Sequence, residues 1–243
     1  VFDFDDTCID GDLGDAVFHH AVDAGTLTSH PDGLDSPPTA AGWLAAAEGI
    51  LDEAGPEQGY PFFVRAFAGW TVEQFRAHTR AVLERELATP RGSRTLGGRQ
   101  VRSGIRYRAP VVKLARRLHG AGWQVWLVSG TAEWAVEVGV EPLGVPRERV
   151  CGQRVELADG VLTDEPVRPT VFGPGKVEVL RRHLDAPPDL ALGDSPNDTQ
   201  LLGWARCAVV LDAGDANSLG HLGRQRGWAV QPVESSWRPV LFG

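Results

Sequence analysis

The second half of the chain alternates between two hydrophobic patterns. Apolar residues spaced three and four apart predict helices that begin near 109, 132 and 176, the second ending near 143. Short apolar runs typical of buried strands lie at 123–128, 150–153, 190–193, 207–211 and 228–230. Strands that alternate with helices indicate βαβ units, so we expect an α/β fold built on a parallel sheet. Residues 155–163 differ, because they alternate around Asp159-Gly160, a pair that favours the tight turn of a β-hairpin.

The first half is mostly helical in pattern. Helices are predicted at 13–24, at 39–54 and from Thr71, which can form a capping box with Gln74. Glycines and prolines at 55–56 and 59–61 predict breaks, and the breaker-rich stretch 29–38 predicts a loop. The basic, glycine-rich stretch 91–104 predicts a linker or mobile loop. We therefore expect a core formed by 1–14 and 106–243, interrupted by a mostly α-helical inserted domain at 15–105.

Composition and charge narrow the partners. The formal net charge of -8 argues against nucleic acid or an anionic membrane, since both select a basic surface. No stretch approaches the ~20 consecutive apolar residues of a membrane span. The cysteines Cys8, Cys151 and Cys207 stand far apart without CxxC spacing, so we expect neither disulfides nor a zinc site, and a cytoplasmic location. Only two residues precede Asp3, so the first strand is expected to begin upstream, where a targeting segment would not be visible.

Two carboxylates stand out at the start of the chain. Asp3 and Asp5 follow an apolar beginning, and side chains two positions apart share one face of a strand. Desolvated carboxylates repel each other, and this arrangement is tolerable when a cation lies between them or one is protonated. A hard divalent cation with oxygen ligands would satisfy both.

Further polar residues follow other predicted strands. Ser129 comes at the end of the strand at 123–128, and Asp194 and Asp198 follow the strand at 190–193. Ligands of open parallel sheets bind beyond the carboxyl ends of the strands, so these side chains are expected to converge. Taken singly, Ser129 reads equally well as a helix cap, Lys176 as an exposed first-turn residue and 193–198 as an ordinary turn.

In their order along the chain, these stretches resemble the four motifs of the haloacid-dehalogenase-like (HAD) phosphatases. Asp3-Phe4-Asp5-Asp6-Thr7 is similar to motif I, Asp-x-Asp-x-Thr, and Ser129-Gly130-Thr131 to motif II. Lys176 holds the place of motif III, and Gly193-Asp194-Ser195-Pro196-Asn197-Asp198 that of motif IV. The resemblance implies a doubly wound, Rossmann-like core, with the inserted helices forming a C1-type cap that closes over it.

The resemblance also implies roles for the motif residues. Asp3 would be the nucleophile that accepts the phosphoryl group, and Asp5 the general acid and base. Magnesium (Mg²⁺) would bind the Asp3 carboxylate, the Asp5 backbone carbonyl and the Asp194 carboxylate, with Asp198 orienting waters around it. The presence of Asp5 favours phosphate transfer, because the dehalogenase branch lacks an acid there.

Other residues are expected to hold the substrate. By the same resemblance, Ser129 would donate a hydrogen bond to the phosphoryl group and Lys176 would neutralise both the phosphate and the nucleophile. Thr7 would brace the motif I loop, and Gly130 and Asn197 are predicted to contact the substrate.

Within this family the core arrangement is most similar to the phosphoserine phosphatase branch, but the residues expected to meet the substrate depart from that branch. Their glutamate for the substrate ammonium is replaced by Asp12, with Asp15 able to share its role, and Thr131 departs from their usual Ser-Gly-Gly. Phe63 falls where their carboxylate-binding arginine would lie, although Arg65 is nearby. The cap is rich in aromatic residues, either as its own core or as a cation-π pocket for a quaternary ammonium, as in phosphorylcholine phosphatases. These aromatic residues are Trp43, Tyr60, Phe62, Phe63, Phe67 and Trp70.

The predicted function is a magnesium-dependent phosphomonoesterase that works through an aspartyl-phosphate. Its substrate would be a small phosphorylated metabolite bearing an amine, such as phosphocholine, phosphoethanolamine or phosphoserine. The alternatives are a phosphatase for another small ester, such as a sugar phosphate, and a non-catalytic module that binds phosphorylated metabolites. The occupied catalytic positions favour an enzyme.

Overall fold

The computed structural model describes residues 1–27, 38–214 and 219–233. The loop predicted at 29–38 lies almost entirely outside the described residues. Among these residues, no helix has both the length and the apolar character needed to cross a membrane.

A parallel sheet forms the core, as the alternating pattern predicts. β5 (Leu127–Ala132) pairs with β6 (Val150–Gln153), and β10 (Cys207–Asp212) lies between β9 (Leu190–Gly193) and β11 (Ala229–Pro232). Phe2 bridges in parallel to both Leu127 and Leu192, so the start of the chain joins the two groups. The resulting order is β11, β10, β9, residues 1–3, β5, β6, which places Asp3 and Asp194 on adjacent segments.

Helices cover both faces of the sheet. Leu127, Leu192 and Val209 belong to one hydrophobic core with α5 and α6. The residues that alternate with them, among them Val128 and Ala191, belong to a second core with α7 and α8. The doubly wound α/β prediction is thus confirmed. The helices of this part are α5 (Ala109–Gly120), α6 (Glu133–Gly139), α7 (Pro174–Leu180), α8 (Thr199–Trp204) and α9 (Gly220–Gln225).

Two core boundaries differ from the prediction. The strand predicted at 123–128 is β5, which begins at Leu127 and continues to Ala132, while Trp123 at the start of the predicted run is 48 % exposed. The helix predicted to end near 143 stops at Gly139 and gives way to a 3₁₀ turn at Glu141–Leu143. Pro142 has no N–H to continue the helix.

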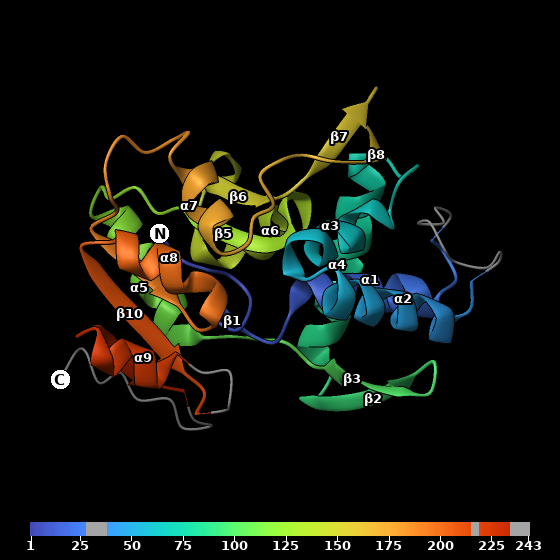
Figure 1. Cartoon of the computed structure of the whole chain (residues 1–243), viewed down its shortest axis with the longest axis horizontal. Helices are drawn as coiled ribbons and strands as arrows, with labels where there is room; N and C mark the ends of the chain where they lie inside the picture. The colour runs from blue at the N-terminus through green and yellow to red at the C-terminus, as the bar shows by residue number, and fades with distance from the viewer. Residues whose placement is uncertain (28–37, 215–218, 234–243) are drawn as a thin grey trace.

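The inserted segment gathers on one side of the sheet (Figure 1). Its ends meet where β1 (Ile9–Asp10) pairs antiparallel with β4 (Arg106–Tyr107). The predicted capping box of Thr71 and Gln74 is present. The division into a core and a cap stays a prediction. The helices of the segment are α1 (Leu13–Asp23), α2 (Ala40–Glu53), α3 (Pro56–Arg65) and α4 (Val72–Ala88).

Two local predictions in this segment are wrong. Residues 91–104 form no mobile loop but a hairpin of β2 (Gly92–Leu96) and β3 (Arg99–Ser103), since two glycines with positive φ make its turn. The predicted break at 55–56 is present, because α2 ends at Glu53 and Gly55, with positive φ, precedes α3. The predicted break at 59–61 is wrong, since α3 begins with Pro56 in its first turn and continues through Gly59 and Pro61. The hairpin predicted around Asp159-Gly160 is present as β7 (Val155–Ala158) and β8 (Val161–Pro166).

Candidate active site

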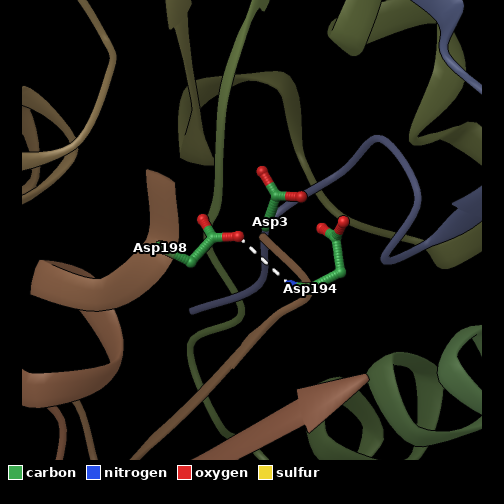
Figure 2. A group of neighbouring side chains, drawn as sticks. All are labelled: Asp3, Asp194 and Asp198. Carbon is green, nitrogen blue, oxygen red and sulfur yellow. Dashed lines mark hydrogen bonds between the residues drawn. The ribbon is translucent and has the colours of Figure 1, made fainter. Parts of the chain in front are cut away.

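Three carboxylates meet at the carboxyl ends of neighbouring segments. Asp3 follows the bridging residue Phe2, Asp194 follows β9, and Asp198 ends a 3₁₀ turn at Pro196–Asp198. Each offers an oxygen within 4.8 Å of those of the other two. Figure 2 shows the three side chains around one centre, with Asp198 bonded to the backbone of Asp194.

Lys176 from the first turn of α7 lies between two of these carboxylates. Its Nζ donates to Oδ1 of Asp3 at 2.6 Å and to Oδ1 of Asp198 at 2.7 Å, and all three side chains are buried. Burial opposes the charge on Lys176, but Asp198 and Asp3 outweigh it and raise the pKa of the ammonium. Lys176 is therefore a permanent cation at the floor of the site.

The surrounding backbone fixes Asp198. Its Oδ2 accepts from the backbone N of Asp194 at 3.2 Å and of Ser195 at 3.3 Å, while Lys176 occupies Oδ1. A Cβ on Gly193 would lie 2.5 Å from that of Asp198, so only glycine leaves room for this carboxylate. Since both oxygens of Asp198 accept hydrogen bonds from the protein, Asp198 is better placed to orient waters around a metal ion than to bind the ion directly.

The remaining two carboxylates suit a hard cation. Burial, together with Asp3 and Asp198, raises the pKa of Asp194 well above its ordinary value. Burial and Asp198 likewise raise the pKa of Asp3 to about 7, although Lys176 acts against them. Carboxylates that oppose each other's ionisation in this way bind a divalent cation favourably, and oxygen ligands are those that magnesium prefers. The residues present thus fit Mg²⁺.

Asp5 lies beside this centre in a different environment. Its Oδ2 accepts from Ser129 Oγ at 2.8 Å and from Thr131 Oγ1 at 2.9 Å, and its Oδ1 accepts from the backbone N of Leu13 at 2.8 Å. Burial and the charge of Asp12 raise its pKa to about 7 despite these donors. A carboxyl group with a pKa near 7 is suited to both donating and accepting a proton near neutral pH.

Two hydroxyl groups hold Asp5. Ser129 is one of them, and its expected hydrogen bond to the phosphoryl group stays a prediction. Thr131, noted in the sequence only as a departure, shares the task of holding Asp5. The sequence could have predicted this role of Thr131, because Ser129 and Thr131 are two positions apart on β5, as Asp3 and Asp5 are in motif I, and such side chains share one face of a strand.

Thr7 connects the first motif to the fourth and does not line the cavity described below. Its buried Oγ1 donates to Oδ1 of Asp194 at 3.0 Å, so it links the first motif to the fourth.

A cavity of about 170 Å³ opens above these groups. Eight of the predicted residues line it: Asp3, Asp5, Asp12, Ser129, Gly130, Lys176, Asp194 and Asn197. Six other residues complete it, of which Thr131 is described above: Asp6, Tyr60, Thr131, Val171, Phe172 and Ser195. Val171 and Phe172 precede α7 in a segment that carries no motif, and nothing in the sequence pattern indicated them.

Asp6 connects the site to the hairpin of β2 and β3. Both of its carboxylate oxygens accept from Arg102 on β3, at 2.7 and 2.9 Å, and its Oδ1 also accepts from the backbone N of Gly11. These partners are far apart in sequence, which is why the pattern of residues 91–104 did not predict the contact.

A second cavity of about 50 Å³ adjoins the first and shares four lining residues with it. The rings of Tyr60, Phe63, Phe67 and Phe75 line it together with the carboxylates of Asp12 and Asp15. Burial and Asp15 raise the pKa of Asp12 well above its ordinary value, and burial and Asp5 raise that of Asp15 to about 6.

The predicted cap aromatics have overlapping roles. Trp43, Phe62 and Phe63 all pack edge-on against Phe18 in the helical core. Phe63 also lines the second cavity, together with Tyr60 and Phe67. Trp70 packs edge-on against Phe67.

Arg65 does not reach either cavity. Its Nε donates to the backbone O of Asp164 on β8 at 2.7 Å. Among the described residues that line the two cavities, Lys176 is the only lysine, arginine or histidine. The structure therefore gives no support to Arg65 as a base for a substrate carboxylate.

Comparison with known proteins decides the family. The haloacid dehalogenase-like hydrolase family matches residues 1–203. This chain belongs to that family. The predicted resemblance is thereby confirmed, and with it the assignment to a hydrolase family.

One relative is similar to part of this chain. The chain is similar to a phosphoserine phosphatase of Halobacterium salinarum (strain ATCC 29341 / DSM 671 / R1), with 31% identity over 117 residues, 46% of this chain and 55% of that protein. The match thus spans about half the length of that relative.

Solved structures share the fold. A protein of unknown function from Bordetella pertussis Tohama I has a TM-score of 0.72 at 18% identity, over 94% of this chain and 95% of its own. A substrate-bound phosphoserine phosphatase has a TM-score of 0.53 at 19% identity, over 86% of this chain and 83% of its own.

Proposed function

We propose that this HAD-like hydrolase is a magnesium-dependent phosphomonoesterase that uses Asp3 as its nucleophile. The observation that carries the proposal is the buried Lys176, which contacts Asp3 beside Asp194 at the floor of an acidic cavity. A phosphate dianion repels an aspartate, so attack requires cations that also fix the geometry. Lys176 supplies one such charge from within the chain.

The residues fit the metal in named roles. Asp3 and Asp194 would hold Mg²⁺ with the Asp5 backbone carbonyl, and Asp198 would orient the surrounding waters. When bound, the ion would withdraw charge from the phosphoryl oxygens. Its second function would be to allow Asp3 and Asp194 to stay ionised together.

Proton transfer falls to Asp5. As a bond forms between an Asp3 oxygen and phosphorus, the phosphorus–ester oxygen bond breaks and protonated Asp5 gives its proton to the departing alkoxide. Ionised Asp5 then takes a proton from water, whose oxygen attacks phosphorus and breaks the bond to Asp3, releasing phosphate. The hydroxyls of Ser129 and Thr131 keep Asp5 in place through both steps.

We further propose that the leaving group carries an amine. The second cavity combines the carboxylates of Asp12 and Asp15 with aromatic faces, and both features attract an alkylammonium. The two cavities share Asp12, so one short substrate can span them. The absence of a lysine, arginine or histidine from the described lining of the second cavity favours phosphocholine and phosphoethanolamine over phosphoserine, whose carboxylate would lie near Asp12 without a cation.

Phosphoserine stays the second candidate, since the curated relative is a phosphoserine phosphatase. A panel of phosphorylated metabolites, assayed with Mg²⁺ and with a chelator, tests both levels of the proposal. We expect metal-dependent phosphate release, with kcat/KM highest for phosphocholine or phosphoethanolamine. A preference for sugar phosphates would contradict the amine proposal, and binding without hydrolysis of any ester would support the non-catalytic module.

A further inference from the structure

Tyr60 occupies the boundary between the two cavities. Four residues line both of them, and Tyr60 is the one contributed by α3. The others are Asp12, Gly130 and Thr131. The ring of Tyr60 thus faces the reaction centre on one side and the aromatic residues of the helices on the other.

Three separate segments of the sheet region hold this ring. Asn197 Nδ2 donates to the Tyr60 hydroxyl oxygen at 2.9 Å, and the ring of Phe172 lies 5.3 Å away between centroids. The third contact is with Gly130 on β5, where an added Cβ would lie 2.6 Å from Cδ1 and 2.7 Å from Cε1 of Tyr60. The ring therefore rests directly on the backbone of Gly130, and its position is fixed from three sides.

We propose that Tyr60 is a specificity-determining residue that restricts the enzyme to phosphate esters with short leaving groups. The inference rests on the proposed phosphomonoesterase function. The first cavity, about 170 Å³, receives the phosphoryl group, and the second, about 50 Å³, has room only for a small terminal group. With the ring seated on Gly130, a leaving group must pass beside Tyr60 to reach the second cavity. Longer chains would have to displace the ring from its three contacts.

A series of linear alkyl phosphates from ethyl to hexyl tests this inference without relying on an amine. In the unchanged enzyme, kcat/KM should fall with chain length. Tyr60→Ala joins the two cavities, so the ratio of kcat/KM for hexyl phosphate to that for ethyl phosphate should rise about tenfold or more, the size expected for fitting extra methylenes. A Tyr60→Ala enzyme that keeps the original ratio would overturn the inference.

One conservative variant of Tyr60 separates the effect of the ring from that of its hydroxyl, and the same substitution at Tyr107 serves as the control. Tyr60→Phe keeps the ring and should keep the length ratio, even if loss of the Asn197 contact raises KM. Tyr107→Phe is the matched control, because the Tyr107 hydroxyl donates to Gly139 O at 2.8 Å outside both cavities. A ratio that changes in Tyr60→Phe as much as in Tyr60→Ala would show that the hydroxyl, and not the ring, selects the substrate.

A double-mutant cycle tests the seat of the ring independently of activity. Gly130 does not have a positive φ, so Gly130→Ala adds no backbone strain and acts mainly through its clash with Tyr60. We expect it to lower the melting temperature clearly in the normal background and much less in Tyr60→Ala. Additive effects would contradict the contact.

If the unchanged enzyme hydrolysed no phosphate ester, the proposed function would fail, and the substrate inference with it. An unaltered length ratio in active Tyr60→Ala would overturn the inference alone.

Discussion

The two cavities of the site are built on opposite principles. The first cavity, called the phosphate cavity below, takes Asp3 and Asp194 from the carboxyl ends of neighbouring segments and Lys176 from the first turn of α7. Lys176, Asp198 and Asp5 each have two or more fixed hydrogen-bond partners. The second cavity, called the ring-lined cavity below, takes its four rings from Tyr60 and Phe63 on α3, Phe67 just beyond it and Phe75 on α4, and these rings pack by shape. Charge shifts between groups during the reaction, so the phosphate cavity needs polar groups held by fixed hydrogen bonds, because misplaced charges in a buried site are costly. Selection among leaving groups needs only a cavity of suitable shape.

The largest effect should follow from changing the nucleophile in the phosphate cavity. Asp3→Asn preserves shape but removes the attacking oxygen, so phosphatase activity on p-nitrophenyl phosphate should fall by about 10⁴-fold or more. The melting temperature should show that the fold is retained. Asp23→Asn is the control, since Asp23 lies at the end of α1 and pairs with Arg94. Substantial residual turnover in Asp3→Asn would remove the covalent mechanism.

Asp5→Asn should cost about 10²–10⁴ in rate, the usual contribution of general acid–base catalysis. Because the raised pKa of Asp5, about 7, leaves it protonated below that pH, kcat/KM for esters with poor leaving groups should decline as the pH rises through 7. That decline should disappear in Asp5→Asn. A variant that loses metal binding but keeps the pH profile would show that the role is misassigned.

Lys176→Ala should weaken the phosphate cavity by removing its built-in cation. We expect a loss of about 10²–10³ in rate and weaker binding of vanadate or beryllium fluoride, measured by inhibition. Lys113→Ala is the matched control, because Lys113 is exposed on α5. Unchanged affinity and rate would move the role to another base, with Arg181 and Arg182 as the next candidates.

The smallest effect concerns the ring-lined cavity. Asp12→Asn retains an N-cap for α1, so stability should change little. It should lower kcat/KM for phosphocholine and phosphoethanolamine about tenfold more than kcat/KM for glycerol phosphate, the order expected for one charge contact. An equal loss on all three substrates would place Asp12 in the common chemistry and break the division between the cavities.

The same contrast explains what the sequence could predict. Asp3, Ser129 and Asp194 follow apolar runs, and strand ends of a parallel sheet lie together, so local pattern was enough to place them. Their neighbours were harder to identify. Phe172 and Asp6 are placed by contacts between segments that are distant in sequence, and the hydrophobic pattern along the chain cannot predict such contacts.

The inserted helices show where local pattern is insufficient. Breaker residues argued against α3, yet Pro56 is acceptable in its first turn, and Gly59 lets α3 approach Leu51 of α2 closely. Whether a ring also lines a cavity depends on that packing: Phe62 and Phe63 both pack against Phe18, but of the two only Phe63 lines the second cavity. The aromatic composition of the cap could therefore not assign individual rings.

The central claim is that Asp3 becomes phosphorylated during turnover, and acid quenching followed by peptide mass spectrometry tests it most directly. With p-nitrophenyl phosphate and Mg²⁺, the peptide containing Asp3 should gain the mass of one phosphoryl group. The modified fraction should increase in Asp5→Asn, in which hydrolysis of the intermediate is slowed, and vanish in Asp3→Asn. Turnover without any modification of this peptide in Asp5→Asn, or a phosphoryl group on another residue, would contradict the account.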